Sequence, residues 1–228
     1  MNKYYKSKFL SNIIIFCSAS IATFSIPPFS FFFLIFVLGF GIYLITLRSS
    51  LKQTFIAGWF LGFGWFAFGL YWIGSAFMVA DTYHKVMMPL AIVILPSVLA
   101  IFWGLACVFA KLLTKKNQSS LFLIIVFLTL FEYLRAKLFT GFPWLMPSII
   151  LSSNEYLIQI FALVGSFTAN LFVFSFSILP FVLISNFKSK HIIFVSLSIP
   201  ITILFFSSFV RFYNKDTEKL DNNLITLV

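Results

Sequence analysis

Charged side chains are scarce in this chain of 228 residues, where Asp, Glu, Lys and Arg together make up 10%. An ordinary soluble domain has about 25%. Histidine and cysteine occur twice each, which excludes a disulfide scaffold and argues against sites that need several sulfur or imidazole ligands. Both cysteines, Cys17 and Cys107, lie within apolar runs without a ligand-type neighbour. We therefore predict no metal site and no cofactor.

Apolar surface is what the chain has in excess. Hydrophobic residues make up 61% of it, phenylalanine alone occurs 34 times, and the mean hydropathy is +1.05. A soluble fold of this length could not hide so much apolar surface, so the excess must face lipid. Open sheets cannot cross a bilayer, and the alternation typical of a β-barrel is absent. The sequence therefore predicts an all-α membrane protein, a bundle of about seven transmembrane helices.

Seven segments are long and apolar enough to cross the hydrocarbon core, which takes about 20 residues of helix. The first follows three lysines, as the core of a signal peptide would, but it has 18 residues. A signal peptide core has about 7–15 residues, so we predict that this segment is a retained span. The predicted spans are residues 9–26, 29–47, 55–80, 86–110, 121–140, 156–183 and 192–210.

The net charge of +10 would suggest a nucleic-acid partner in a soluble protein. Here the basic residues cluster between apolar runs, a pattern that sets membrane topology, so we predict no nucleic-acid partner. With a cytoplasmic N-terminus, the inner segments hold ten basic residues and no acids, and the outer segments hold six basic residues and all six acids. This bias predicts that orientation. After seven spans, residues 211–228 would form a periplasmic tail.

Glycine and aromatic residues crowd the third predicted span. Gly58 and Gly62 form a GxxxG pair, and Gly69 falls within about 40° of them on a helix. The pattern predicts a seam where another helix packs closely. A second interpretation is an aromatic wall for a lipid acyl chain, with Tyr71 and Trp72 as the contacts, because amphipathic rings favour the membrane interface.

Glu132 is the one acid within a predicted span, and Arg135 follows on the same helix face. A carboxylate at membrane depth needs a partner or water. Two interpretations stay open: an ion pair that stabilises the helix end, or the polar floor of an outward cavity that contacts a lipid head group. The aromatic segment beyond it, with Phe142 and Trp144, predicts either a re-entrant interfacial arm or a simple loop.

Catalytic side chains are not evident in the sequence. The two histidines, His84 and His191, fall on opposite sides of the predicted membrane. No Ser/His/Asp set, phosphate-binding loop or dinucleotide loop occurs.

The order of these motifs resembles a known family. The run Gly69-Leu70-Tyr71-Trp72, then Glu132-x-x-Arg135, then Thr140-Gly141-Phe142-Pro143-Trp144 is similar to the membrane part of apolipoprotein N-acyltransferase. The likeness covers most of residues 20–228. Family members usually continue after the Pro-Trp pair with a Gly-Tyr-containing stretch, where this chain has Leu145-Met146-Pro147-Ser148.

The resemblance implies an activity in the bacterial inner membrane. Such enzymes transfer an acyl chain from a phospholipid to the N-terminal cysteine of a diacylated lipoprotein, through a thioester on the cysteine of a Glu-Lys-Cys triad. The triad lies in a nitrilase-like domain after the seventh span. No triad residue is found in this chain, so we expect a truncated or split form that is inactive alone and works with membrane phospholipid, diacylated lipoprotein and a separately encoded nitrilase-like domain. The alternatives are a small transporter or channel, and a non-functional gene remnant.

Overall fold

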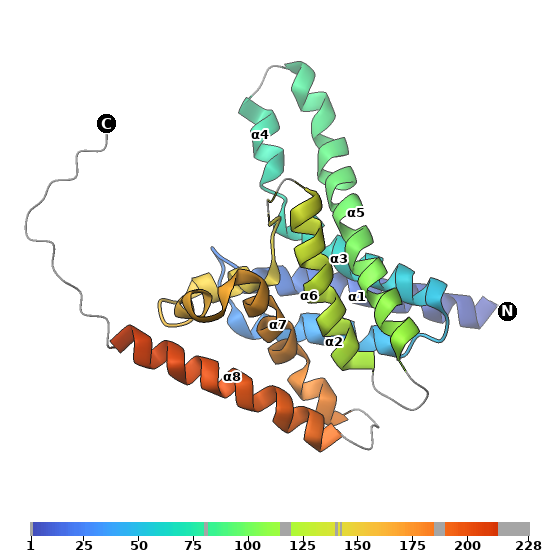
Figure 1. Ribbon diagram of the computed structural model, residues 1–228. Coiled ribbons are helices and arrows are strands. Elements are labelled where there is room, and N and C mark those ends of the chain that lie inside the picture. Colours follow the sequence, from blue (N-terminus) through green and yellow to red (C-terminus); the bar gives the residue numbers. More distant parts are fainter. Residues whose placement is uncertain are drawn as a thin grey trace, which may run out of the picture.

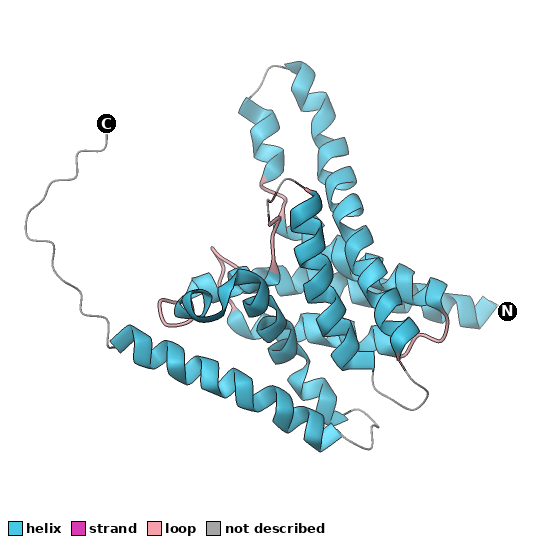
Figure 2. Ribbon diagram, in the orientation of Figure 1, coloured by secondary structure: helices cyan, strands magenta, loops and turns pink. Residues whose placement is uncertain are grey.

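The computed structural model describes residues 2–79, 82–114, 120–139, 141, 143–184 and 190–213. All regular structure within these ranges is helical (Figure 2), as the apolar pattern predicts. The helices are α1 (Asn2–Ala22), α2 (Ile35–Thr46), α3 (Leu51–Gly69), α4 (Ile73–Val79), α5 (Thr82–Leu113), α6 (Ser120–Leu138), α7 (Gln159–Ile184) and α8 (Lys190–Tyr213), with the 3-10 helices η1 (Thr23–Ser25), η2 (Phe32–Leu34) and η3 (Pro147–Ser153).

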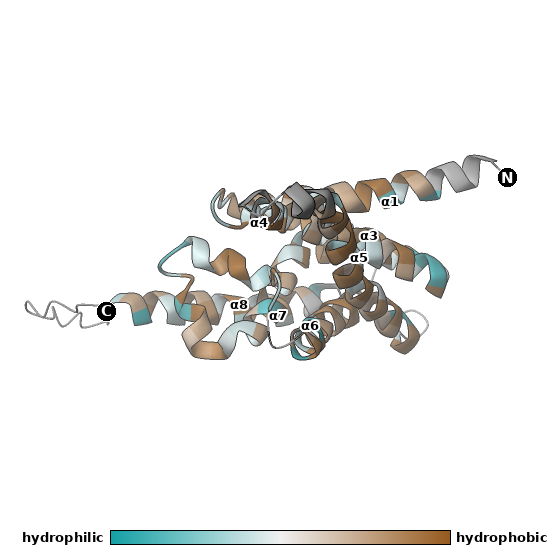
Figure 3. Cartoon of the chain, turned by 90° about the horizontal axis from the view of Figure 1, so that it is seen from above, coloured by the Kyte–Doolittle hydropathy of each residue, from teal (hydrophilic) through white to brown (hydrophobic). Residues whose placement is uncertain are grey.

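Four helical segments of the described chain are long and apolar enough to cross a membrane. They are Lys8–Ser25, Met87–Leu113, Gln159–Ile184 and Phe194–Tyr213. Hydrophobic residues cover most of the helices, whereas hydrophilic residues gather at some ends and turns (Figure 3). The chain is therefore a membrane protein. The first turn of α1 and the last turn of α8 lie at opposite ends of the molecule (Figure 1). The total of seven spans and the sidedness of each end stay predictions.

The third predicted span, residues 55–80, is not one continuous helix. Helix α3 ends at Gly69, and a turn at residues 70–72 leads into α4, where the amide of Ile73 donates to the carbonyl of Leu70. Helix α4 packs against α5, and together they stand out from the bundle as a hairpin (Figure 1). With 32 residues, α5 is about 48 Å long, which exceeds the hydrocarbon thickness of about 30 Å. Its length therefore allows part of the hairpin to reach beyond the lipid core.

The segment after α6 begins with irregular backbone rather than with a helix. The predicted span 156–183 starts as a turn, and α7 begins only at Gln159. Within α7, Gly165 has φ 75° and ψ 166°, a conformation that only glycine adopts readily. The helix therefore bends there, and η3 and the first turns of α7 fold back beside the bundle.

Close helix approach holds the bundle together at glycines. Gly58 and Gly62 of α3 lie against α5, where an added Cβ at Gly58 would be 2.9 Å from the backbone oxygen of Trp103. Gly39 of α2 lies against α7, and a Cβ there would overlap the carbonyl oxygen of Ser177. Without side chains at these points, the helix backbones reach van der Waals contact, the usual source of helix association in lipid.

Replacing Gly39 with Ala tests the α2–α7 contact. Its methyl group would meet a backbone carbonyl that cannot rotate away, and overpacking of this kind costs about 1–3 kcal/mol. In Gly62→Ala the new Cβ would lie 3.0 Å from the Cα of Ala100, so we expect a smaller loss. The measurement is denaturant unfolding in detergent, followed by tryptophan fluorescence. Val93→Ala, on the lipid-exposed face of α5, is the control. A loss for Gly39→Ala no greater than that of the control would contradict the contact.

Candidate functional site

Glu132 and Arg135 form a completely buried ion pair on α6. Both side chains are 0% exposed, and Nη2 of Arg135 lies 2.6 Å from Oε2 of Glu132. Nε of Arg135 donates to Oε1 of Glu132 at 3.3 Å. The pair therefore has the bidentate fork geometry that makes guanidinium–carboxylate pairs strong. Each charge, buried in an apolar bundle, needs such a partner.

Aromatic side chains from two other helices complete the pair. The indole Nε1 of Trp103 on α5 donates to Oε1 of Glu132 at 2.7 Å. The ring of Phe66 on α3 lies 4.9 Å from the guanidinium carbon of Arg135, a cation–π distance. Phe66 and Trp103 also meet edge to face, with ring centroids 5.4 Å apart. Thus α3, α5 and α6 converge on one buried pair of charges.

The same pair holds the segment that follows α6. We call residues 143–148 the arm. Nη2 of Arg135 donates to the carbonyl oxygen of Trp144 at 2.6 Å, and the indole of Trp65 donates to the carbonyl of the next residue, Leu145, at 2.9 Å. Farther along, the amide of Ser148 donates to Oδ1 of Asn170 on α7 at 2.8 Å. Three helices therefore bind the arm backbone at three points.

Leu145 of the arm has an unfavourable backbone conformation that its contacts maintain. Its φ is 46°, in the left-handed region that costs a residue with a side chain about 1–2 kcal/mol. Its side chain lies against Gly69 at the end of α3, where any Cβ would overlap it. The bond from Trp65 to its carbonyl and this glycine notch keep the leucine in place.

Leu145 of the arm and Ile149 of η3 form one wall of an open groove. The groove has a volume of about 750 Å³, and its other walls are the turn after α1 (Pro27, Pro28), the end of α3 and the residues just beyond it. Tyr71 and Trp72 both line it and are 60% and 51% exposed. Glu132 and Arg135 do not line it. They lie behind the wall, bound to the arm.

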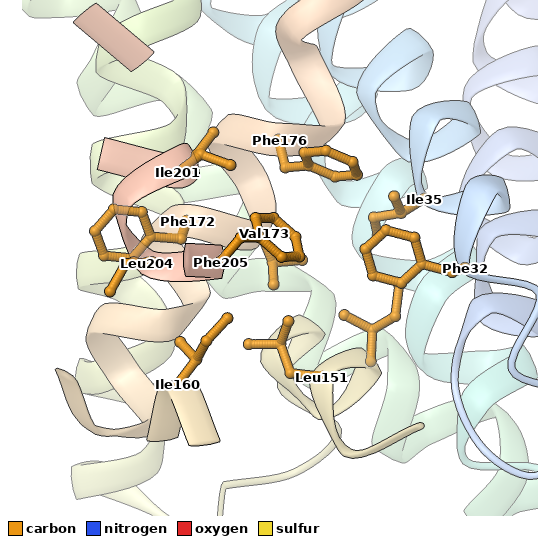
Figure 4. A pocket seen from close by; sticks show the side chains of 11 residues that line it. Phe32, Ile35, Leu151, Ile160, Phe172, Val173, Phe176, Ile201, Leu204 and Phe205 are labelled. Atoms are coloured by element: carbon orange, nitrogen blue, oxygen red, sulfur yellow. The ribbon is translucent and has the colours of Figure 1, made fainter. Parts of the chain in front are cut away.

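A second, smaller cavity lies between α2, η3, α7 and α8 (Figure 4). Its side chains are apolar, among them Phe32, Leu151 and Phe205, and they point toward one another across a space of about 20 Å³. That is roughly the volume of one water molecule, and a water there would find no polar partner. This cavity therefore does not suit a water molecule or a polar ligand.

The structure separates the candidates that the sequence placed together. Tyr71 and Trp72 reach the groove, Glu132 and Arg135 are buried behind the arm, and Trp144 contributes its carbonyl to the pair. Phe142 lies outside the described residues. Gly58 and Gly62 face α5, whereas Gly69 faces the arm. Contact of the six candidate residues with lipid or substrate stays a prediction.

Three further residues of the site were missed in the sequence: Trp65, Trp103 and Asn170. Each acts through a partner 22 to 80 positions away. Trp103 and Asn170 place polar groups within apolar runs. Because a buried N–H or amide needs a hydrogen-bond partner, these positions indicated that a partner exists but not which residue it is.

Neither cysteine is placed where it could act as an acyl-accepting nucleophile. Cys107 is 0% exposed, and its Sγ would lie 2.8 Å from a Cβ at Gly58. Cys17 is exposed in the middle of the apolar segment of α1. In the described ranges, no three His, Cys, Asp or Glu side chains come close enough together to hold a metal ion.

Comparison with known proteins identifies the family. The model of the apolipoprotein N-acyltransferase N-terminal domain matches residues 18–179, well over half of the chain. The chain belongs to the apolipoprotein N-acyltransferase family. Both the Tyr71–Trp72 turn and the Glu132–Arg135 pair fall within the matched residues.

Similar proteins named apolipoprotein N-acyltransferase occur in several bacteria. That of Rhodopseudomonas palustris is 38% identical over 140 residues, which cover 61% of this chain and 26% of the relative. That of Rhizobium leguminosarum bv. trifolii is 32% identical over 185 residues, 73% of this chain and 34% of the relative. The chain thus spans about a quarter to a third of the length of these curated relatives.

Removing the charge of Glu132 is expected to destabilise the fold strongly. Glu132→Gln leaves the guanidinium of Arg135 buried without a counter-charge, which typically costs about 3–5 kcal/mol. Glu155→Gln, at an exposed position, should change the free energy of unfolding by less than about 0.5 kcal/mol. The measurement is denaturant unfolding in detergent. A loss below about 1 kcal/mol for Glu132→Gln would show that the pair is not buried as described.

The bond from Trp65 to the arm can be tested by matched tryptophan substitutions. Trp65→Phe keeps an aromatic ring but removes the donor to Leu145, a loss of about 0.5–1.5 kcal/mol. Hydrogen exchange of the amides of residues 144–146 and 148 should therefore accelerate by roughly twofold to tenfold. Trp59→Phe is the control, because its indole donates to the carbonyl of Ser97 on α5 and does not contact the arm. Equal exchange in the two variants would exclude an anchoring role for Trp65.

Proposed function

We propose that residues 1–228 form the membrane part of a bacterial inner-membrane system that transfers an acyl chain from phospholipid to the N-terminal cysteine of diacylated lipoproteins. Membership of the apolipoprotein N-acyltransferase family supports the reaction. We infer that the part played by this chain is to admit the phospholipid. The groove beside Tyr71 and Trp72 is the observation that supports this role.

The chemistry of the groove suits a lipid. Its lining is almost entirely apolar, with side chains such as Phe24, Phe68 and Ile149, which fits an acyl chain. Tyr71 and Trp72 add polar atoms to large apolar rings at its edge, the arrangement that favours the boundary between acyl chains and head groups. A lipid in the groove would therefore keep its ester groups near these two residues.

The buried pair contributes by keeping the groove open. A flexible wall would have to be ordered when the lipid binds, and that ordering would weaken binding. Arg135 and Trp65 hold the wall in place beforehand through two consecutive carbonyls of the arm. They act as positioning residues, since neither lines the groove.

Acyl transfer itself needs a nucleophile that these residues do not supply. Cys107 is buried against α3 and Cys17 lies in the apolar part of α1. A thioester mechanism requires an activated thiolate with access to both substrates. We therefore assign the thioester step to a nitrilase-like domain with a Glu-Lys-Cys triad, in the same or another polypeptide. A polypeptide of these 228 residues alone is expected to be inactive.

Reconstitution in cells that lack their own acyltransferase tests the proposal. Co-expression of the chain with the nitrilase-like domain of a family member should restore triacylated lipoprotein, measured by mass spectrometry, while either part alone should not. Tyr71→Ala with Trp72→Ala should lower the product at least about fivefold if the groove admits the lipid. Phe206→Ala, equally exposed but on α8, is the control. Product from the 228-residue chain alone, or none from the combination, would refute the assignment.

A further inference from the structure

A buried cation with no acidic partner among the described residues lies at the other end of the bundle. Arg48 is in the turn between α2 and α3 and is only 9% exposed. Nη2 of its guanidinium donates to Oγ of Ser11 and to Oδ1 of Asn12, both at 2.8 Å and both on α1. These partners are neutral, so the two hydrogen bonds hold the positive charge in position without neutralising it.

Within the ranges that the structure describes, no carboxylate forms an ion pair with Arg48. The first acid of the chain is Asp81 and the next is Glu132, whose oxygens are bound by Arg135 and Trp103. Lys52 lies one turn farther on α3 and adds a second positive charge to the same end. An arginine stays protonated even when buried, so this end of the bundle attracts an anion.

The guanidinium also has hydrogen-bonding capacity to spare. It carries five N–H donors, and the described hydrogen bonds use only those of Nη2. Nε is buried with no described partner. A donor buried in this way costs about 1–3 kcal/mol unless an acceptor reaches it. The hydroxyl of Ser11, which accepts from Nη2, has a hydrogen left to donate to the same acceptor.

The surroundings of Arg48 identify the kind of anion. Its sequence neighbour Leu47 is 64% exposed, and Phe9 and Leu10, next to Ser11, are 63% and 59% exposed. These side chains face lipid in a membrane protein. An anion that meets a buried guanidinium and exposed apolar side chains together is the phosphate of a phospholipid, with its acyl chains along α1 and α2.

We propose that Arg48, supported by Ser11 and Asn12, binds the phosphate of an anionic phospholipid at the α1–α2–α3 end of the bundle. The site is separate from the groove at Tyr71 and Trp72, since none of its residues lines that groove. The lipid bound here serves as a structural counter-ion of the fold. The proposal does not depend on the function assigned above.

Lipid titration of the purified 228-residue chain in detergent micelles tests the site. The probe is dioleoyl-phosphatidylglycerol, and the readout is the thermal unfolding midpoint followed by tryptophan fluorescence. The midpoint should rise saturably with this lipid, and much less with dioleoyl-phosphatidylcholine, which has the same chains and no net charge. Inorganic phosphate should have no effect at equal concentration. Equal shifts with the two lipids, or the same shift with inorganic phosphate, would overturn the assignment.

Substitutions locate the effect. Arg48→Gln should lower the apparent affinity for phosphatidylglycerol at least about tenfold. Lys52→Gln, which removes one exposed charge from the same end, should change it less than about twofold. Arg48→Lys keeps the positive charge but loses the forked guanidinium, so its apparent affinity should lie between those of the other two variants. This variant replaces Arg48→Gln in the test if Arg48→Gln does not fold. Unchanged affinity in both Arg48 variants would place the lipid elsewhere and refute the proposal.

Discussion

A carboxylate and a guanidinium cannot remain inside an apolar bundle unless each neutralises the other and their remaining polar atoms find partners. Glu132 and Arg135 meet this constraint except at Nη1 of Arg135, which is buried without a described hydrogen-bond partner. One carboxylate oxygen accepts from the indole of Trp103, and the guanidinium lies over Phe66 and binds the carbonyl of Trp144. The contacts of this one ion pair therefore specify the relative positions of α3, α5, α6 and the arm.

The site follows from that arrangement. An irregular backbone inside an apolar bundle is tolerated only where its polar groups are bound within the protein or reach water. The arm meets this condition through Arg135, Trp65 and Asn170, and its outer surface then becomes a wall of the groove. Arg135, Trp65 and Asn170 thus hold the arm without lining the groove, whereas Leu145 and Gly69 pack together and also line it.

Local sequence patterns predicted much of this structure, but they did not predict the contacts between residues far apart in the sequence. The apolar runs predicted the all-helical membrane fold, and the spacing of Glu132 and Arg135 placed them on one helix face. The break after Gly69 was missed, because Tyr71 and Trp72 continue the apolar run that a helix would show. The closest approach, at Gly39 and Ser177, was missed as well, since Gly39 lacks a glycine partner at i+4. Nothing in the local sequence indicates that Trp103 reaches Glu132 or that Arg135 reaches the arm.

The contact between Arg135 and the arm can be measured in a lipid bilayer. Solid-state NMR on the chain, labelled with ¹⁵N at the guanidinium of arginine and ¹³C at the tryptophan carbonyl, reports the distance from Nη2 of Arg135 to the carbonyl carbon of Trp144. The oxygen lies 2.6 Å from that nitrogen, so with a C=O bond of about 1.23 Å the carbon is at most about 3.8 Å away. Strong dephasing that disappears in Arg135→Lys is the predicted result. Dephasing that is absent, or that survives this substitution, would mean that the pair does not hold the arm.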